Sequence, residues 1–294
     1  MSTLFTLGEF RIDRVVEMSG PLFPASSFLP GLPEDALARE AHWLIPKHFD
    51  EPTGYLIQSD HSWVLRTGKH TILIDSCVGN HKTLPSYEIF AGLETPYLQR
   101  LASIGLSPDD IDFVMCTHLH PDHVGWNTRL ENGKWVPTFR RARYLIGRHA
   151  FDFAQRAIAS GENEAERPVF DESLLPVVEA GLVQYVDDGF EIDHGVVVHN
   201  ADGHTVGHML VHAKSSGASG IFCGDVVHHP LQLRYPHLNS MFCADPEKAA
   251  NTRRAVLEDC AEHNSVLMPV HFAGSSRGHV CRDNDAYTWD EHPD

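Results

Sequence analysis

The sequence is poor in basic residues and lacks long apolar runs, and each absence excludes a class of protein. Its 294 residues contain 23 Lys and Arg against 40 Asp and Glu, which gives a formal net charge of −17 at pH 7. Such an acidic chain has no basic footprint for nucleic acid and no attraction to an anionic membrane surface. No apolar run approaches transmembrane length. We therefore expect neither a nucleic-acid partner nor a membrane span.

The cysteine pattern and the first residues bear on the expected location. The six cysteines are scattered and form no C-x-x-C pair. The opening residues, MSTLFTLGEF, lack the basic and apolar pattern of a secretory leader. We therefore expect free thiols in a reducing compartment and a cytoplasmic protein.

Apolar segments that favour strands alternate with segments that favour helices, without a repeat or a long linker. Stretches rich in Val, Ile and Leu between turn residues predict strands, and a proline followed by acids predicts a helix start. Strands are predicted at 10–18, 54–60, 62–67, 70–76, 113–117, 142–147, 196–200, 207–213, 220–224 and 265–269, and helices at 33–45, 95–104, most of 148–180 and 245–263. The pattern favours one α/β domain over residues 1–294.

The stretch THLHPDHVGWN, at 117–127, gathers three histidines and an aspartate within six positions. It directly follows the apolar run FVMCT, so we expect it on a loop at the carboxyl end of a strand, where α/β sheets keep their ligand sites. Side chains two apart on an extended segment point to one side, so His118 and His120 can hold one metal ion. Asp122 and His123 follow a proline, where the chain turns, and can face a second ion.

Three more ligand-type residues follow predicted strands or loops far along the chain: His204 in NADGHTVGH, Asp225 in IFCGDVV and His271 in LMPVHFAG. Imidazole and carboxylate groups are suitable ligands for zinc, iron, manganese or cobalt. We predict two divalent ions, with zinc as the first choice. The predicted ligands of one ion are His118, His120 and His204, those of the other are Asp122, His123 and His271, and Asp225 bridges the two.

In this order, T-H-x-H-x-D-H, G-H-T, G-D and P-x-H resemble the metallo-β-lactamase superfamily over residues from about 54 to about 280. The resemblance implies an α/β fold, a four-layer αβ/βα sandwich with a dinuclear metal site along one edge. It also implies that Asp75, which ends ILIDS, orients a ligand histidine. Residues 1–53 would then form an N-terminal extension that shapes the pocket.

The predicted metal pair indicates a hydrolase. Two ions about 3.5–4 Å apart lower the pKa of a shared water from about 15.7 towards neutrality, so a bridging hydroxide becomes the nucleophile. Asp122 and Asp225 are then catalytic as well as metal-binding, and the chain has no G-x-S-x-G nucleophile elbow. We expect hydrolysis of a small ester or lactone, a small-molecule substrate, and leave a homodimer open.

Two other activities stay open. A hydroxide of this kind also attacks phosphorus, so an organophosphate triester hydrolase is the alternative in the same class. The alternative of another class is a mononuclear iron dioxygenase that acts on a persulfide. The complete second set of Asp122, His123 and His271 speaks against this alternative.

The residue three positions after the bridging aspartate distinguishes branches of the superfamily. Lactonases carry a tyrosine there, and this chain has His228, which is more similar to the methyl-parathion-hydrolase-like branch. His228 would donate a hydrogen bond to a developing oxyanion or protonate a leaving group. The alternative interpretation is a histidine of the pocket wall without a catalytic role. Its neighbour His229 would point the other way on an extended segment.

The pocket wall is expected near the ligand loops. Its apolar candidates are Trp126, Phe272, Phe49 and Leu233. For Phe49 and Leu233, ordinary core packing is the favoured interpretation. Arg277 and His279, in SSRGHV, are candidates for contact with a substrate carboxylate.

Overall fold

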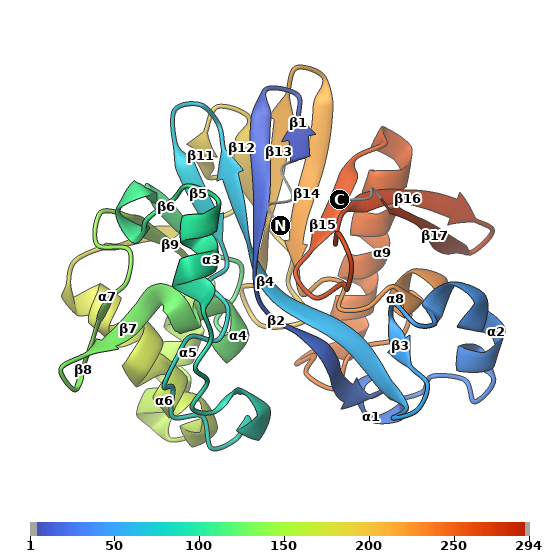
Figure 1. Cartoon of the computed structure of the whole chain (residues 1–294), viewed down its shortest axis with the longest axis horizontal. Helices are drawn as coiled ribbons and strands as arrows, with labels where there is room; N and C mark the ends of the chain where they lie inside the picture. The colour runs from blue at the N-terminus through green and yellow to red at the C-terminus, as the bar shows by residue number, and fades with distance from the viewer. Residues whose placement is uncertain (1–4, 292–294) are drawn as a thin grey trace.

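Two β-sheets lie face to face at the centre of the protein in a computed structural model that describes residues 5–291 (Figure 1). Neighbouring strands of the first sheet are, in order, β1 (Phe5–Leu7), β2 (Phe10–Pro24), β4 (Tyr55–Arg66), β5 (Thr71–Ile74), β6 (Phe113–Cys116), β9 (Arg143–Gly147) and β10 (Val183–Val186), and β3 (Phe49–Asp50) also pairs with β4. Strands β5, β6 and β9 are parallel to one another. Their carboxyl ends therefore meet at one edge of the sheet.

The second sheet follows the order of the sequence. Its strands are β11 (Glu191–Asp193), β12 (Val196–Asn200), β13 (Met209–Ser215), β14 (Ala218–Gly224), β15 (Val266–Pro269), β16 (Gly278–Asp283) and β17 (Ala286–Glu291). Strands β14 and β15 are the parallel pair, and helix α9 (Pro246–His263) connects them. A separate hairpin is formed by β7 (Thr128–Glu131) and β8 (Lys134–Pro137).

The remaining helices lie outside the sheets or around the site. They are α1 (Ala25–Phe28), α2 (Ala36–Leu44), α3 (Tyr97–Ser103), α4 (Pro121–Val124), α5 (Arg148–Ser160), α6 (Arg167–Val169), α7 (Leu175–Glu179) and α8 (Leu231–Arg234). Single 3₁₀ turns occupy Glu88–Phe90, Pro108–Asp110, Gly125–Asn127 and Glu164–Glu166, and a π-helical turn occupies Phe170–Leu174. No helix within residues 5–291 is long and apolar enough to cross a membrane.

Three apolar cores hold these layers together. Trp63 and Ile74 of the first sheet pack with Phe222 of the second in the central core. The outer face of the first sheet packs under α3 and α5, and that of the second packs under α9. The order helix, sheet, sheet, helix confirms the predicted four-layer αβ/βα sandwich.

The structure corrects the predicted strands at 54–60 and 62–67, which are one continuous strand, β4. The polar segment between the two predictions is a sign of a turn when it is exposed. Here Asp60 and His61 are both buried, and His61 contacts the carbonyl oxygen of Pro269 through Nε2 at 3.1 Å. Internal partners thus allow a polar sequence to remain inside a strand.

Residues 5–50 contribute to the main sheet as well as to the pocket. Strand β2 pairs with β4 along nearly its whole length, and it leads into α1, α2 and β3. These elements form a small apolar cluster around Phe28, Leu44 and Leu56. Residues 25–50 therefore lie over one side of the site, whereas residues 5–24 belong to the sheet.

Candidate metal centre

The predicted ligands lie where strands of the two sheets end. His118 and His120 leave the carboxyl end of β6, Asp225 follows β14, and His271 follows β15. The fifth, His204, lies on the loop between β12 and β13. The carboxyl ends of parallel strands are the usual place for ligand sites in α/β sheets, and here two such edges face each other.

The segment after His120 forms the short helix α4, which brings two adjacent ligands to the same centre. His120 precedes the helix in an extended conformation, and Pro121 takes its first position. A proline is favoured there because its fixed φ angle suits a helix and its missing N–H has no intrahelical partner to lose. Asp122 and His123 then occupy the first turn. Asp122 Oδ2 lies 3.6 Å from Nε2 of both His123 and His271.

The His204 loop approaches the start of α9 closely. Gly203 has φ of +133°, and a Cβ atom built there would lie 2.3 Å from the backbone nitrogen of Ala249. Only glycine fits this conformation and this contact. The close approach fixes the loop, so the imidazole of His204 reaches the centre.

The side chains form two groups that share one carboxylate. In the first group, ligand atoms of four residues lie within 4.8 Å of one another: His118, His120, His204 and Asp225. In the second group, the same limit of 4.8 Å holds for Asp122, His123 and His271. All seven predicted ligands are therefore brought together.

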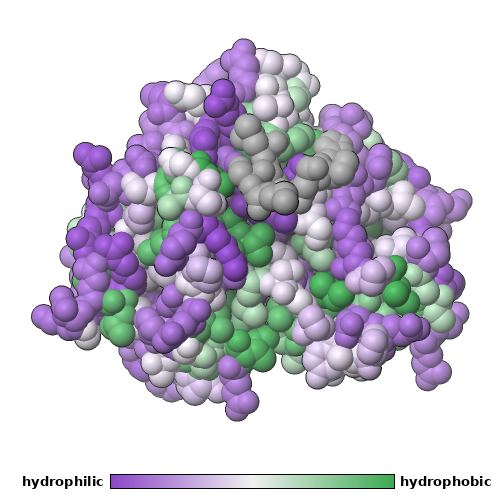
Figure 2. All heavy atoms as spheres, in the orientation of Figure 1, coloured by the Kyte–Doolittle hydropathy of each residue, from purple (hydrophilic) through white to green (hydrophobic). Residues whose placement is uncertain are grey.

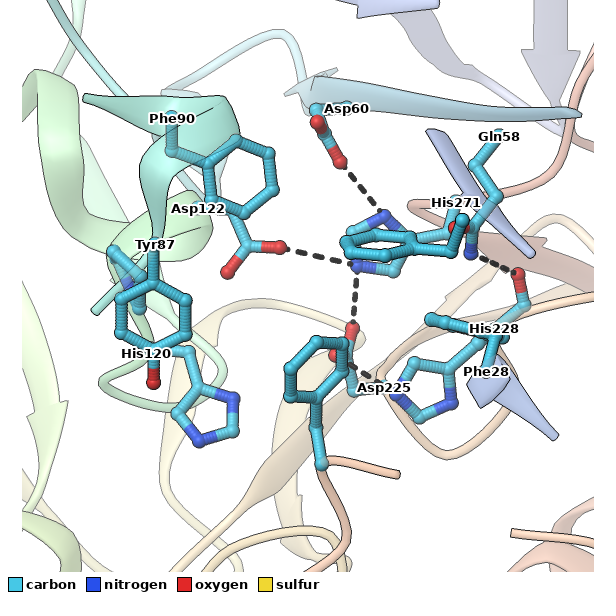
Figure 3. A pocket seen from close by; sticks show the side chains of 13 residues that line it. Phe28, Gln58, Asp60, Tyr87, Phe90, His120, Asp122, Asp225, His228 and His271 are labelled. Atoms are coloured by element: carbon cyan, nitrogen blue, oxygen red, sulfur yellow. Dashed lines mark hydrogen bonds and ion pairs between the residues drawn. The ribbon is translucent and has the colours of Figure 1, made fainter. Parts of the chain in front are cut away.

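The carboxylate of Asp225 lies between the groups and turns one oxygen to each (Figure 3). Its Oδ2 is 3.1 Å from Nε2 of His204 and 3.8 Å from Nε2 of His118. Its Oδ1 is 3.0 Å from Nε2 of His271 and 3.2 Å from Nε2 of His123. A single carboxylate can therefore bind one cation through each oxygen.

Buried carboxylates hold the outer nitrogens of the second group. Nδ1 of His123 lies 2.9 Å from Oδ2 of Asp75, which also accepts a hydrogen bond from the hydroxyl of Thr117. Asp75 has φ of +57°, an uncommon conformation that aspartate tolerates better than most residues. Nδ1 of His271 lies 3.0 Å from Oδ1 of Asp60 in strand β4. In each pair the ring donates to a carboxylate, which orients Nε2 toward the centre.

Neutral side chains hold the outer nitrogens of the first group. Nδ1 of His118 lies 3.1 Å from the hydroxyl oxygen of Thr117, and Nδ1 of His204 lies 3.6 Å from Sγ of Cys243. The backbone N–H of Asp225 donates to Nε2 of His208 at 3.1 Å. These contacts orient the ligands without adding negative charge.

The chemistry of the donors fits divalent metal ions. His118 Nε2, His123 Nε2 and Asp225 Oδ1 are buried and have no hydrogen-bond partner within the described part of the chain. Buried polar atoms are nearly always paired, so orphaned atoms that face one another indicate a bound cation. Burial lowers the pKa of His118 and His120 well below the ordinary histidine value. These rings are therefore neutral at pH 7, the form that binds metal.

His228 lies beside Asp225 at the wall of the pocket. Its Nε2 is 3.1 Å from Oδ2 of Asp225 and 3.2 Å from the hydroxyl oxygen of Ser240. Its ring packs edge-on against Phe28. Burial lowers its pKa to about 3, so the ring is neutral at pH 7. His229 points away, as predicted, and its Nε2 lies 2.9 Å from the carbonyl oxygen of His48.

The pocket over the two groups has an aromatic wall that comes from distant segments. Besides five predicted residues (His120, Asp122, Asp225, His228 and His271), it is lined by Phe23, Phe28, Gln58, Asp60, Tyr87, Phe90, Pro121 and Phe242. Sequence reasoning missed these. Only Asp60 gives a local signal, as an acid at the end of the predicted strand 54–60.

Trp126 and Phe272, predicted for the apolar wall, lie in the core instead. Trp126 stacks on Tyr97, and its indole N–H donates to Glu17. Phe272 is fully buried and packs against Trp289. Both residues closely follow metal-ligand segments. The 3₁₀ turn at Gly125–Asn127 directs the ring of Trp126 into the core, and the extended backbone at Phe272 does the same for its ring. Phe49 and Leu233 are core residues, in line with the favoured interpretation.

Arg277 and His279 do not line the pocket either. The backbone turns at Gly274 and Ser276, which both have positive φ, and then enters β16. The guanidinium of Arg277 lies over the ring of Phe5, and His279 pairs with Val266 of β15. The prediction failed because the residues after His271 turn away from the pocket and form a sheet hairpin, β16 and β17.

The sandwich and the paired ligand groups together define a recognised family. The model of the metallo-β-lactamase superfamily matches residues 59–271, and the chain belongs to this superfamily. Its members are hydrolases, and the His/Asp groups are suited to divalent metals.

Curated and solved relatives agree with this assignment. N-acyl homoserine lactonase AiiB of Agrobacterium fabrum is 32% identical over 128 residues, which are 40% of this chain and 41% of that protein. The match thus spans less than half of that relative. Two solved structures share the fold: the hydrolase AbOPH (TM-score 0.82, 22% identity, 100% of this chain and 98% of that chain) and the dizinc quorum-quenching lactonase AidC (TM-score 0.78, 20% identity, 100% and 97%).

Proposed function

We propose that the protein is a hydrolase of a small carboxylic ester or lactone that uses two divalent metal ions, with zinc as the first choice. The first ion would be held by His118, His120 and His204. The second would be held by Asp122, His123 and His271, with Asp225 shared.

The observation that carries the proposal is the position of Asp225. Each of its oxygens faces the imidazoles of one group at 3.0–3.8 Å. A site for one ion would need only one of these groups. Both groups are buried, and orphaned nitrogens of each face the shared carboxylate.

The roles of the side chains follow from this arrangement. When bound, the two ions supply an activated water and polarise the oxygen of the substrate's acyl group. Asp225 keeps the two groups at a fixed separation. His228, whose Nε2 lies beside Asp225 Oδ2, is placed to offer a hydrogen bond to an oxygen of the reacting bond. The aromatic wall limits the access of bulk water.

The lining of the pocket supports an uncharged substrate. None of the residues that line it within 5–291 is Lys or Arg, so it offers no ordinary partner for an anionic group. A neutral ester or lactone meets this condition, and the similarity to an N-acyl homoserine lactonase agrees with it. A neutral phosphotriester meets it equally well and is the second candidate.

A substrate panel on defined metal forms tests the proposal. Metal-free protein is reloaded with zinc, manganese, cobalt or iron, and kcat/KM is measured for an aryl ester, an acyl lactone and a phosphotriester. We expect no turnover without metal and the highest kcat/KM on the ester or the lactone. Preference for the phosphotriester would favour the second candidate, and full activity of the metal-free protein would refute both. Oxygen consumption with a persulfide, supported by one iron per chain, would favour the dioxygenase.

A further inference from the structure

The space directly over the two ligand groups is small. It measures about 30 Å³, which holds only about two or three water molecules. A second cavity of about 170 Å³ lies next to it, and His120 lines both. Because His120 borders both cavities, an arm of a molecule whose reacting bond lies at Asp225 would pass this side chain to enter the larger cavity.

The second cavity is apolar and lies under α5, α6 and the π-helical turn. Its apolar lining includes Leu119, Ala154, Ala157, Ile158, Phe170 and Val206. Asn163 and Thr205 are neutral, and the one carboxylate, Glu166, already accepts a hydrogen bond from Tyr87. No Lys or Arg lines it within the described residues. The cavity therefore suits an uncharged apolar group and offers no partner to an anion.

The surroundings of the two cavities are apolar as well. Large apolar side chains that remain exposed include Phe153 (45%), which lines the second cavity, and Ile89 (42%) and Met241 (53%). The last two are chain neighbours of Phe90 and Phe242, which line the metal pocket. Figure 2 shows apolar residues gathered in the lower middle of this face, between the α5 side and the α1 side.

We propose that the second cavity binds an acyl or alkyl arm of the substrate and thereby selects esters or lactones that carry such an arm. This inference rests on the proposed function, because the arm extends from a bond cleaved at the metal centre. The apolar lining makes burial of each methylene favourable. A two-carbon acyl group is too short to fill the cavity, whereas a longer chain can.

Variants of α5 test the inference. Ala154→Phe fills the cavity, and Ala159→Phe, the same change at an exposed position of the helix outside the lining, is the matched control. Phe153→Ala removes an exposed apolar contact and carries little risk to folding. The readout is the ratio of kcat/KM for 4-nitrophenyl octanoate to that for 4-nitrophenyl acetate on metal-loaded protein. A second readout is the Kd of octanoate from calorimetry on the same metal-loaded protein, where the bound metal ions would hold its carboxylate.

We expect the wild-type ratio to be about ten or more, to fall about tenfold in Ala154→Phe and about threefold in Phe153→Ala, and to be unchanged in Ala159→Phe. The Kd of octanoate should rise in the same order. Unchanged ratios and Kd values in both cavity variants would overturn the inference. A changed sedimentation coefficient in the cavity variants, with the kcat/KM ratio unchanged, would also overturn it. The apolar face would then join two copies of the chain. Octanoate binding that Ala154→Phe weakens, without hydrolysis of either ester, would support the arm site and refute the proposed function.

Discussion

The two ligand groups use the same kind of imidazole but support it differently. In the second group, His123 and His271 each donate to a buried carboxylate, from Asp75 and Asp60. In the first group, a hydroxyl and a thiol take the corresponding places at His118 and His204. A carboxylate partner makes the imidazole a stronger ligand, whereas a neutral partner only orients it.

The pKa values differ between and within the groups. In the first group, Asp225 outweighs burial at His204 and raises its pKa to about 8, whereas burial lowers the pKa of His118 and His120 well below the ordinary histidine value. For His123 and His271, the carboxylates around them outweigh burial and raise the pKa well above it. The second group also has Asp122 as a ligand of its own. We therefore expect the second group to bind its metal ion more tightly than the first.

The largest effect is expected from removing the shared carboxylate. Asp225→Ala leaves several imidazoles without the anion between them, so both groups lose metal affinity and kcat/KM should fall about a thousandfold or more. Elemental analysis and kinetics measure the two effects. His194→Ala, at an exposed turn far from the site, is the control and should match the wild type. Retention of two ions and of activity in Asp225→Ala would show that the carboxylate is not shared.

Removal of the His228 imidazole should lower activity without removing metal. His228→Phe keeps an aromatic ring in the wall but loses the hydrogen bond, so we expect kcat/KM to fall about a hundredfold with the metal content unchanged. Wild-type activity in this variant would leave His228 as a wall residue. Loss of metal would instead make it a ligand of the first group.

The expected difference in metal affinity between the two groups depends most on the carboxylate partners, Asp60 and Asp75. Asp60→Asn and Asp75→Asn remove one negative charge each, and asparagine tolerates the backbone conformation of residue 75. We expect the affinity for one of the two ions to fall about 10–100-fold in each variant. Asp193→Asn breaks a similar pair with His70, whose Nδ1 lies 2.9 Å from Asp193 in a part of the protein away from the site, and should leave metal binding unchanged. An equal loss of affinity for both ions in these variants would show that the two groups do not bind their ions separately.

The smallest effect on metal affinity is expected from removing a neutral partner of the first group. Cys243→Ala removes a neutral partner of His204, so the affinity for one ion should fall only about threefold or less. Cys281→Ala, at an exposed cysteine, is the matched control. A larger loss than in Asp60→Asn would reverse the proposed order of the groups.

The ligands could be predicted from the sequence because their positions are marked locally. His118, His120 and Asp225 each follow an apolar run that ends a strand, and strand ends of this kind meet at the edges of the sheets. The alternation of strands and helices predicted an α/β domain, and the resemblance to the superfamily supplied its four layers. Asp75 was placed by the resemblance of its motif and lies 2.9 Å from a ligand histidine.

The pocket wall could not be predicted because long-range packing builds it. Phe28, Tyr87 and Phe242 come from three distant segments, and no spacing in the sequence relates them. Nearness in sequence to a ligand was misleading for Trp126 and Phe272, since the backbone turns their rings into the core. Asp60 was missed because it ends the predicted strand 54–60, and nothing in its local sequence relates it to His271.

The most direct test counts the divalent ions that metal-free protein must bind to regain hydrolysis. Zinc is titrated into the metal-free chain while bound metal and ester hydrolysis are both followed. We expect two ions per chain, the first bound more tightly, and activity that rises with the second. Full activity at one ion per chain, or without any metal, would contradict this expectation.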